Sequence, residues 1–560
     1  MLGGPAETRV RNGSADARRA RASEASEAHR AVAPARGMEA ATDGGEASEA
    51  HRAVAPARGM EAATDGGGDD GGGGGDAPPA AALYVGAAVR VCAERGRVEA
   101  HAEACVAVGA GGDVLASAFG GGSVEASVMA ALAEHGIGRG ACTVIRLGPR
   151  EMLLPGLIDA HVHAPQYAFA GTGTDRALMG PTGWLETYTF PWERACSDDA
   201  AGLGRRAFDA CVRATLAEGT TCANYFGVLS SAGCCALADA CAAAGQRAFV
   251  AKVCMDRASP EDYVESAEEG VRGARALAEH CATLPLVHAA LAPRFVPTCS
   301  NESLEALGAL AEELGPACLV HTHVSESLDE VEYVKIVEGN AAARDAPILD
   351  AAGLLRPRAT ILAHGVHLTD YELRLLAQRE CAIAHCPLSN WFFAHGVLRA
   401  KRCQRMGVTL CLGTDVAGGY SPSMLNACQH AVAASRAAGF VARAAKDETW
   451  DEEEEHLDYA EAFWMATAGG AAALGCAHRL GRLEAGFAFD ALVVDLSRLE
   501  EDVAVVVGST GTGPQTTSNA QSRFERFVNR GCSSDIAHVF VQGRRVAGRV
   551  GTAPDAAGAQ

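Results

Sequence analysis

The stretch Leu153-Leu-Pro-Gly-Leu-Ile-Asp-Ala-His-Val-His163 decides how the fold of this chain is interpreted. An apolar, strand-like run ends here in two histidines that are separated by a single residue. Side chains two positions apart on a strand point to the same side, so His161 and His163 are expected to face the same way. This pattern indicates a buried strand that delivers two imidazoles to one end of a sheet.

Strand-like runs alternate with amphipathic helical stretches from this point onward. The predicted strands are Leu153 to His163, Thr220 to Phe226, Arg247 to Met255, Leu286 to Pro293, Cys318 to His323, Ala359 to His364, Cys381 to His385 and Val408 to Asp415. Helices are predicted between them, for example over 303–314 and 371–379. Eight strand-then-helix units over about 300 residues are typical of a TIM (β/α)8 barrel, and an open doubly wound sheet is the alternative.

Shorter β-like segments flank this region on both sides. Leu83 to Val91 and Ala104 to Val108 precede it, and a second β region, Leu483 to Val546, follows a predicted helix over 460–474. We expect the two flanks to pair into one small β-sandwich domain beside the barrel. The predicted division is 82–154 and 481–548 for the two parts of the β domain, 155–480 for the catalytic barrel and 549–560 for a flexible tail.

The first 81 residues differ in composition from the rest of the chain. They are rich in Ala, Gly, Glu and Arg, and the 22-residue stretch from Glu24 to Gly45 recurs without change from Glu46 to Gly67. A segment with so few large apolar side chains cannot offset the entropy lost on ordering. We therefore predict a disordered, low-complexity segment that is dispensable for catalysis. We predict a cytoplasmic location, and the arginines of this segment leave targeting to an organelle as the alternative.

Composition excludes several classes of function. The 560-residue chain carries 48 Lys+Arg against 69 Asp+Glu, a formal net charge of −21, which argues against binding to nucleic acid. No window has the 18 or so uninterrupted apolar residues that a membrane span requires, so a soluble protein without membrane contact is predicted. The 20 cysteines are scattered through apolar runs, which favours reduced, buried thiols over a disulfide framework.

Polar residues at the ends of the predicted strands form the candidate metal site. The first strand ends in His161 and His163, the fifth in His323, the sixth in His364 and the eighth in Asp415. The carboxyl ends of all strands in a TIM barrel meet at one mouth. Three or four imidazoles and a carboxylate that converge there are the ligands of Zn²⁺ or a similar ion. Taken singly, each histidine is interpreted more readily as a satisfied core residue.

Glu326 follows His323 by three residues and is the candidate proton carrier. A carboxylate beside a metal site can take a proton from water and later deliver it to a leaving group. The nearby Glu330 and Glu332 are interpreted as solvated acids of an exposed helix start. A further histidine, His321, is expected to lie deeper in the barrel on the same side as His323.

Two sets of motifs carry a resemblance to known families. Pro155-Gly-Leu-Ile-Asp-Ala-His-Val-His163, His323-Val-Ser-Glu326, Ala363-His-Gly365 and Gly413-Thr-Asp415 resemble the metal motifs of the amidohydrolase superfamily. A second set resembles the guanine deaminase family within it: Ala164-Pro-Gln-Tyr-Ala-Phe-Ala-Gly171, Tyr188-Thr-Phe-Pro191, Lys252-Val-Cys-Met-Asp256, Pro293-Arg-Phe295, Ala384-His-Cys-Pro387 and Leu412-Gly-Thr-Asp-Val-Ala-Gly-Gly-Tyr420. The likeness extends from about residue 83 to residue 548.

This resemblance implies a set of roles for individual residues. One Zn²⁺ per chain is held by His161, His163, His323 and Asp415, and the catalytic residues are Glu326, His364 and Asp415. The substrate-binding residues are Gln166, Trp184, Leu185, Arg294, Phe295 and His364, with Gln166 and Arg294 on the carbonyl edge of a purine. The implied reaction is hydrolysis of guanine to xanthine and ammonia in purine catabolism, carried out by a homodimer.

Several alternatives stay open at this stage. Leu388 and the bulky Trp391 depart from the family pattern, so another purine, a pyrimidine or a triazine is a rival substrate, in a related aminohydrolase or chlorohydrolase. A two-metal hydrolase with Lys252 as a carboxylated bridge is the second alternative, and a non-catalytic scaffold is the third. Zinc and iron both suit this ligand set.

Overall fold

The structure, a computed structural model, describes residues 80–447, 450–451, 455–500 and 519–549. The predictions made for residues 1–79 and 550–560 lie outside this part of the chain. Within it, every helix is too short or too polar to cross a membrane.

Eight parallel strands form the barrel, and they are neighbours in the order in which they follow along the chain. They are β6 (Leu157–His163), β7 (Thr220–Phe226), β8 (Arg247–Cys254), β9 (Val287–Pro293), β10 (Leu319–Val324), β11 (Thr360–His364), β12 (Ala382–His385) and β13 (Thr409–Leu412). The residues just after β13 join the first strand, since the Asp415 N–H donates to the His161 carbonyl at 2.8 Å and the His163 N–H to the Val416 carbonyl at 2.9 Å. The predicted TIM barrel is therefore confirmed.

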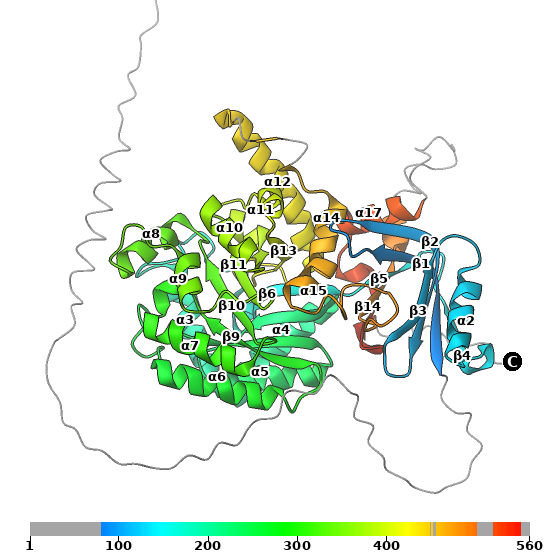
Figure 1. Cartoon of the computed structure of the whole chain (residues 1–560), viewed down its shortest axis with the longest axis horizontal. Coiled ribbons are helices and arrows are strands. Elements are labelled where there is room, and N and C mark those ends of the chain that lie inside the picture. The colour runs from blue at the N-terminus through cyan, green and yellow to red at the C-terminus, as the bar shows by residue number, and fades with distance from the viewer. Residues whose placement is uncertain (1–79, 448–449, 452–454, 501–518, 550–560) are drawn as a thin grey trace, which may run out of the picture. The chain divides into compact units, whose positions relative to one another are not determined.

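Helices surround these strands, as the cyan, green and yellow part of Figure 1 shows. They are α3 (Phe190–Asp198), α4 (Arg205–Ala217), α5 (Ser231–Ala244), α6 (Ala267–Cys281), α7 (Asn301–Leu314), α8 (Leu328–Val337), α9 (Asp345–Ala351), α10 (Asp370–Gln378), α11 (Ala400–Arg405), α12 (Met424–Ala445), α14 (Tyr459–Trp464) and α15 (Gly470–Ala473). Many begin at a Ser or Thr whose side chain accepts a hydrogen bond from the first turn, for example Ser300 before α7 and Thr369 before α10. Such caps satisfy backbone N–H groups that the helix leaves without partners.

The two flanks of the barrel build one further sheet, which Figure 1 shows as blue strands beside orange and red ones. Its strands follow the order β16-β15-β14-β5-β1-β2-β3, and β4 pairs with β1. The elements are β1 (Ala81–Val91), β2 (Val98–Gly109), β3 (Val114–Phe119), α2 (Val124–Glu134), β4 (Cys142–Arg146), β5 (Glu151–Pro155), β14 (Ala491–Asp495), α17 (Ala520–Arg530), β15 (Ile536–Val541) and β16 (Arg544–Gly548). The antiparallel pair of β14 and β5 joins the two flanks.

Side chains from both flanks share one hydrophobic core. Tyr84 on β1 stacks on Phe489 with ring centroids 4.8 Å apart and contacts Phe540 on β15 edge-on at 5.7 Å. The two flanks thus form one sheet domain. The second β region also contains a helix, α17, which the sequence analysis did not predict.

One predicted strand proved to be two. The run from Leu153 to His163 is divided at Gly156, so that β5 belongs to the flanking sheet and only β6 belongs to the barrel. A Cβ atom on Gly156 would lie 2.2 Å from the side-chain oxygen of Thr221. A larger residue therefore does not fit where the chain passes from the flanking sheet into the barrel. The sequence shows one continuous apolar run because both strands are buried, so the division between them could not be predicted.

Candidate active site

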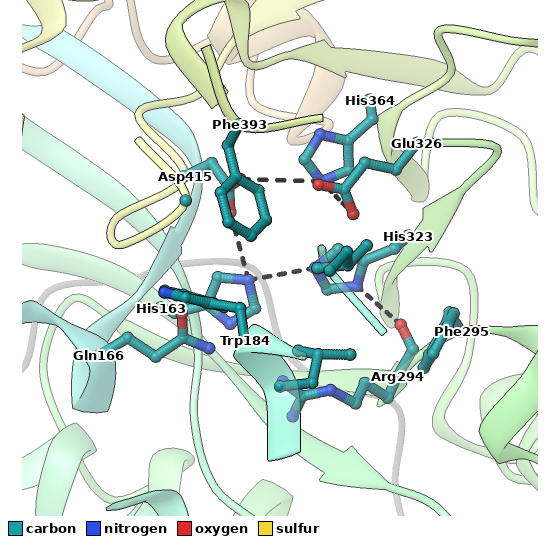
Figure 2. A pocket seen from close by; sticks show the side chains of 13 residues that line it. His163, Gln166, Trp184, Arg294, Phe295, His323, Glu326, His364, Phe393 and Asp415 are labelled. Carbon is teal, nitrogen blue, oxygen red and sulfur yellow. Dashed lines mark hydrogen bonds and ion pairs between the residues drawn. The ribbon is translucent and has the colours of Figure 1, made fainter. Parts of the chain in front are cut away.

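Four side chains that could hold a metal ion meet at the mouth of the barrel. His161 and His163 lie at the end of β6, His323 near the end of β10, and Asp415 three residues after β13. His163 Nε2 lies 3.1 Å from His323 Nε2 and 3.3 Å from Asp415 Oδ1, and His161 Nε2 lies 3.0 Å from the same oxygen. One ligand atom from each of the four residues lies within 4.8 Å of all the others. Figure 2 shows three of the four converging.

This spacing fits a tetrahedral ion. Two ligand atoms that each lie about 2.1 Å from a tetrahedral metal are about 3.4 Å apart, close to the separations in this cluster. His161 Nε2 is buried and has no hydrogen-bond partner, although it faces the Asp415 carboxylate. A buried nitrogen of this kind is costly unless an ion or a donor satisfies it. The donor set and its geometry therefore suit Zn²⁺.

Burial keeps these imidazoles neutral, which is the form that binds metal. It lowers the pKa of His163 to about 4 and that of His323 well below its usual value. Burial acts in the opposite direction on the carboxyl group of Asp415 and raises its pKa. The close approach of the imidazoles of His161, His163 and His364 outweighs that effect, and the pKa of Asp415 lies well below its ordinary range.

The second ring nitrogen of two candidate ligands, His161 and His323, is also held. His323 Nδ1 lies 2.7 Å from the backbone carbonyl of Arg294, which orients the ring so that Nε2 faces the cluster. His161 Nδ1 lies 2.6 Å from His321 Nε2. As expected, His321 is buried on the same side of β10 as His323. Its contact with Nδ1 holds the ring of His161 in place. Such partners fix the ring orientation of metal-binding histidines.

Glu326 and His364 complete the polar half of the site. Both side chains are buried, and His364 Nε2 lies 3.6 Å from Glu326 Oε2 and 3.8 Å from Asp415 Oδ2. His364 Nδ1 contacts the side-chain oxygen of Asn390 at 2.8 Å, which turns Nε2 toward the two carboxylates. Burial, and then the charge of Asp415, raise the pKa of Glu326 well above its usual value, so this group is suited to carry a proton.

The other half of the site is a pocket of about 440 Å³, counted with its open mouth. Every predicted substrate-binding residue lines it: Gln166, Trp184, Leu185, Arg294, Phe295 and His364. Figure 2 labels all of them except Leu185, and their side chains lie around the same space as Glu326 and Asp415. Leu178, Phe393 and Gly418 line the pocket too, and sequence reasoning did not select them.

Two buried polar residues that support this site were missed. Glu193 in α3 accepts hydrogen bonds from Gln166 and Arg294, and Asn390 contacts His364. Glu193 comes two residues after the quoted motif Tyr188-Thr-Phe-Pro191. Its closeness to this motif was the signal in the sequence that could have identified it.

The interpretation of Glu330 as a solvated acid was wrong. Glu330 is buried rather than solvated, because its carboxylate folds back onto the backbone of Ser325 and Glu326.

The loop that departs from the family pattern reaches the pocket through Phe393. Leu388 is buried and does not line the pocket, and Trp391 packs on His430.

Lys252, the candidate bridge of a two-metal site, points elsewhere. Its ammonium group lies 2.6 Å from Glu265 and is buried on the outer side of β8, and it does not line the pocket. Lys252 therefore takes no part in the candidate metal site.

Comparison with known proteins agrees with this geometry. Residues 152–546 match the model of the amidohydrolase family, so the chain belongs to that family. Its similar relatives include a probable guanine deaminase of Schizosaccharomyces pombe, 36% identical over 72% of this chain and 73% of that protein, and the guanine deaminase of Homo sapiens, 33% identical over 72% and 85%. The predicted membership of the guanine deaminase group is confirmed.

Solved structures show the same fold. A guanine deaminase from C. acetobutylicum with bound guanine superposes with a TM-score of 0.70 at 24% identity, over 83% of this chain and 99% of that one. The E. coli guanine deaminase superposes with a TM-score of 0.69 at 24% identity, over 84% and 99%.

Proposed function

We propose that this chain hydrolyses guanine to xanthine and ammonia. The observation that carries the proposal is the convergence of two groups of residues on one pocket. The cluster of His161, His163, His323 and Asp415 lies at its base, and Gln166 lies beside Arg294 across the same space. Hydrolysis of guanine needs both groups. The His/Asp cluster serves the attack of water on a ring carbon, and Gln166 and Arg294 hold the carbonyl edge of the ring in place.

One Zn²⁺ per chain would be held by His161, His163, His323 and Asp415. When bound, it would supply a Lewis acid that makes water nucleophilic at neutral pH. The ligand separations of 3.0 to 3.3 Å and the unpartnered nitrogen of His161 support this assignment.

Glu326 moves the protons in this proposal. It takes a proton from the attacking water and gives it to a ring nitrogen of the purine, while the oxygen bonds to the carbon that carries the amino group. It then carries the proton of the new hydroxyl to that amino group, which leaves as ammonia. Its raised pKa matches a group that must both accept and donate. His364 and Asp415 hold the oxygen in line with the carbon.

Gln166 and Arg294 bind the carbonyl edge of the ring, and apolar side chains enclose its faces. Trp184, Leu185 and Phe295 form these walls. A planar, polar heterocycle needs a few fixed hydrogen-bond partners on apolar walls, and the arginine side chain offers a rigid fork of donors.

The experiment is ammonia release from purified, zinc-loaded protein with guanine, adenine, cytosine and a triazine in parallel. Turnover of guanine alone is expected. Turnover of another ring instead would discard the substrate assignment and keep the metal site. Removal of the ion with a chelator is expected to abolish activity, and reloading with zinc or iron, with the metal content measured, identifies the competent ion and its number per chain.

The proposal extends to the assembly and the place of action. A homodimer in purine catabolism follows from the resemblance described above, and a cytoplasmic location from the prediction of reduced thiols. The net charge of −21 argues against a nucleic-acid partner. Mass measured by light scattering after gel filtration tests the dimer, and a fluorescent fusion of the full chain tests the compartment.

A further inference from the structure

One buried carboxylate holds both donors of the proposed purine site. Glu193, in the first turn of α3, is fully buried. Its Oε1 accepts from Gln166 Nε2 at 2.8 Å, and its two oxygens accept from Arg294 Nη1 at 2.7 Å and Nη2 at 3.2 Å. Resting on the proposed function, we infer that Glu193 is a positioning residue that makes the pocket select a purine with a carbonyl oxygen.

The carboxylate decides which way the Gln166 amide faces. An ionised carboxylate can only accept hydrogen bonds, so Gln166 must turn its NH₂ group toward Glu193. Gln166 Oε1 then lies 3.4 Å from the backbone N–H of Ala417. With one N–H engaged by Glu193, the second N–H of the same nitrogen is available to an acceptor in the pocket. A carbonyl oxygen of the substrate is such an acceptor, whereas an amino group is not.

Arg294 is held in the same way on two sides. The Glu193 carboxylate lies along one edge of the guanidinium, and the ring of Phe190 lies 5.1 Å from the guanidinium carbon. Phe190 and Glu193 are three residues apart on α3, so one helical turn provides both contacts. The hydroxyl group of Tyr263 donates to Glu193 Oε2 at 3.3 Å and holds the carboxylate from behind.

Glu193 itself is not among the residues that line the pocket. Any effect it has on substrate choice must therefore pass through Gln166 and Arg294. Sites that hydrogen-bond a particular substrate group discriminate strongly against an analogue that lacks it, because buried donors are then left without a partner. That discrimination depends on donors whose directions are fixed, and Glu193 fixes them.

The test compares guanine with 2-aminopurine, which has the same reacting carbon and leaving amino group but no carbonyl oxygen. The wild-type protein is expected to favour guanine in kcat/KM. The Glu193→Gln variant is expected to lose about tenfold or more for guanine, mainly through KM, and far less for 2-aminopurine. Glu193→Asp keeps the charge but is one methylene shorter, and it is expected to lose part of the preference.

A matched control separates positioning from stability. Asp490 forms a similarly buried ion pair with Arg247, 3.0 Å long and outside the pocket. Asp490→Asn is expected to lower the melting temperature and leave the preference for guanine unchanged. Equal losses on both substrates in Glu193→Gln, or a wild-type preference in a folded Glu193→Asp protein, would overturn the inference. A wild-type protein inactive on guanine would instead overturn the proposed function, and the inference with it.

Discussion

The carboxylate of Glu330 accepts a hydrogen bond from the backbone N–H of Glu326, with 2.7 Å between Oε2 and the nitrogen. Its other oxygen accepts from the N–H of Ser325 at 3.1 Å. Ser325 has a left-handed backbone with φ of 47°, so the chain leaves β10 in a strained turn that Glu330 holds in place. A residue assigned to solvent from its sequence context thus sets the position of the proposed proton carrier.

Replacement of Glu330 by alanine is therefore expected to lower kcat for guanine by about 10- to 100-fold, because a displacement of about 1 Å in a catalytic group has effects of that size. KM should change little, since Glu330 does not line the pocket. The control is Glu332→Ala on the same helix, whose side chain is 67% exposed and pairs only with Lys335 among the contacts described. Equal kcat values in the two variants would contradict the positioning role.

Glu326→Gln tests the proton carrier directly. The amide keeps the shape of the side chain but cannot carry protons, so kcat is expected to fall by about 10² or more. Metal content should stay near that of the wild type, because Glu326 is not one of the four clustered ligands. Near-normal turnover in the variant would remove Glu326 from its proposed role.

Arg294→Ala separates substrate binding from metal binding. The KM for guanine is expected to rise by about tenfold or more as the donor fork is lost. Metal content should persist, since the group that orients His323 is the backbone carbonyl of residue 294. The variant should also be less stable by on the order of 3 kcal/mol, because it leaves Glu193 buried without its charged partner. An unchanged KM would show that the pocket assignment is wrong.

The barrel strands and the metal cluster were predictable because their signals are local. Each strand is an apolar run, and each candidate ligand lies at or near the end of such a run, as His163 does at the end of β6. Barrel topology then brings these ends together without further information.

Residues whose role depends on distant partners were not predictable in this way. Glu193 is an ordinary acid in the first turn of a helix until the fold brings Arg294, 101 residues later, within 2.7 Å. The division of the first strand at Gly156 likewise depends on contact with Thr221. Charge and periodicity in the sequence report only the local surroundings of a residue. The role of Glu193 and the division at Gly156 are set by tertiary packing instead.

The N-terminal segment is expected to play no part in catalysis. A chain that begins at Asp76 keeps all of β1, which starts at Ala81 and pairs with β2, β4 and β5. Its kcat and KM for guanine should match those of the full chain within about twofold, since tolerated truncations are those that leave packed backbone intact. A large loss of activity in the shortened chain, at an unchanged melting temperature, would assign the segment a role in the reaction.

A second buried carboxyl lies beside Glu330 and makes stability depend on pH. Asp345 Oδ2 accepts from the N–H of Ser325 at 3.0 Å, so two carboxylates approach one nitrogen. Burial raises the pKa of Asp345 to about 6 and, together with the charge of Asp345, that of Glu330 well above its usual value.

A carboxyl whose pKa is higher in the folded than in the unfolded chain favours folding when protonated and opposes it when ionised. Its contribution is therefore fully favourable below about pH 4, the usual pKa of an unfolded aspartate, and is lost as the pH rises to about 6. Asp345→Asn removes this loss and keeps an acceptor for Ser325. The variant is expected to be more stable than the wild type above pH 6, by on the order of 1 kcal/mol, with a smaller difference near pH 4. Melting temperatures measured from pH 4 to pH 8 test this expectation, and a difference that does not grow with pH would show that folding does not raise the pKa of Asp345.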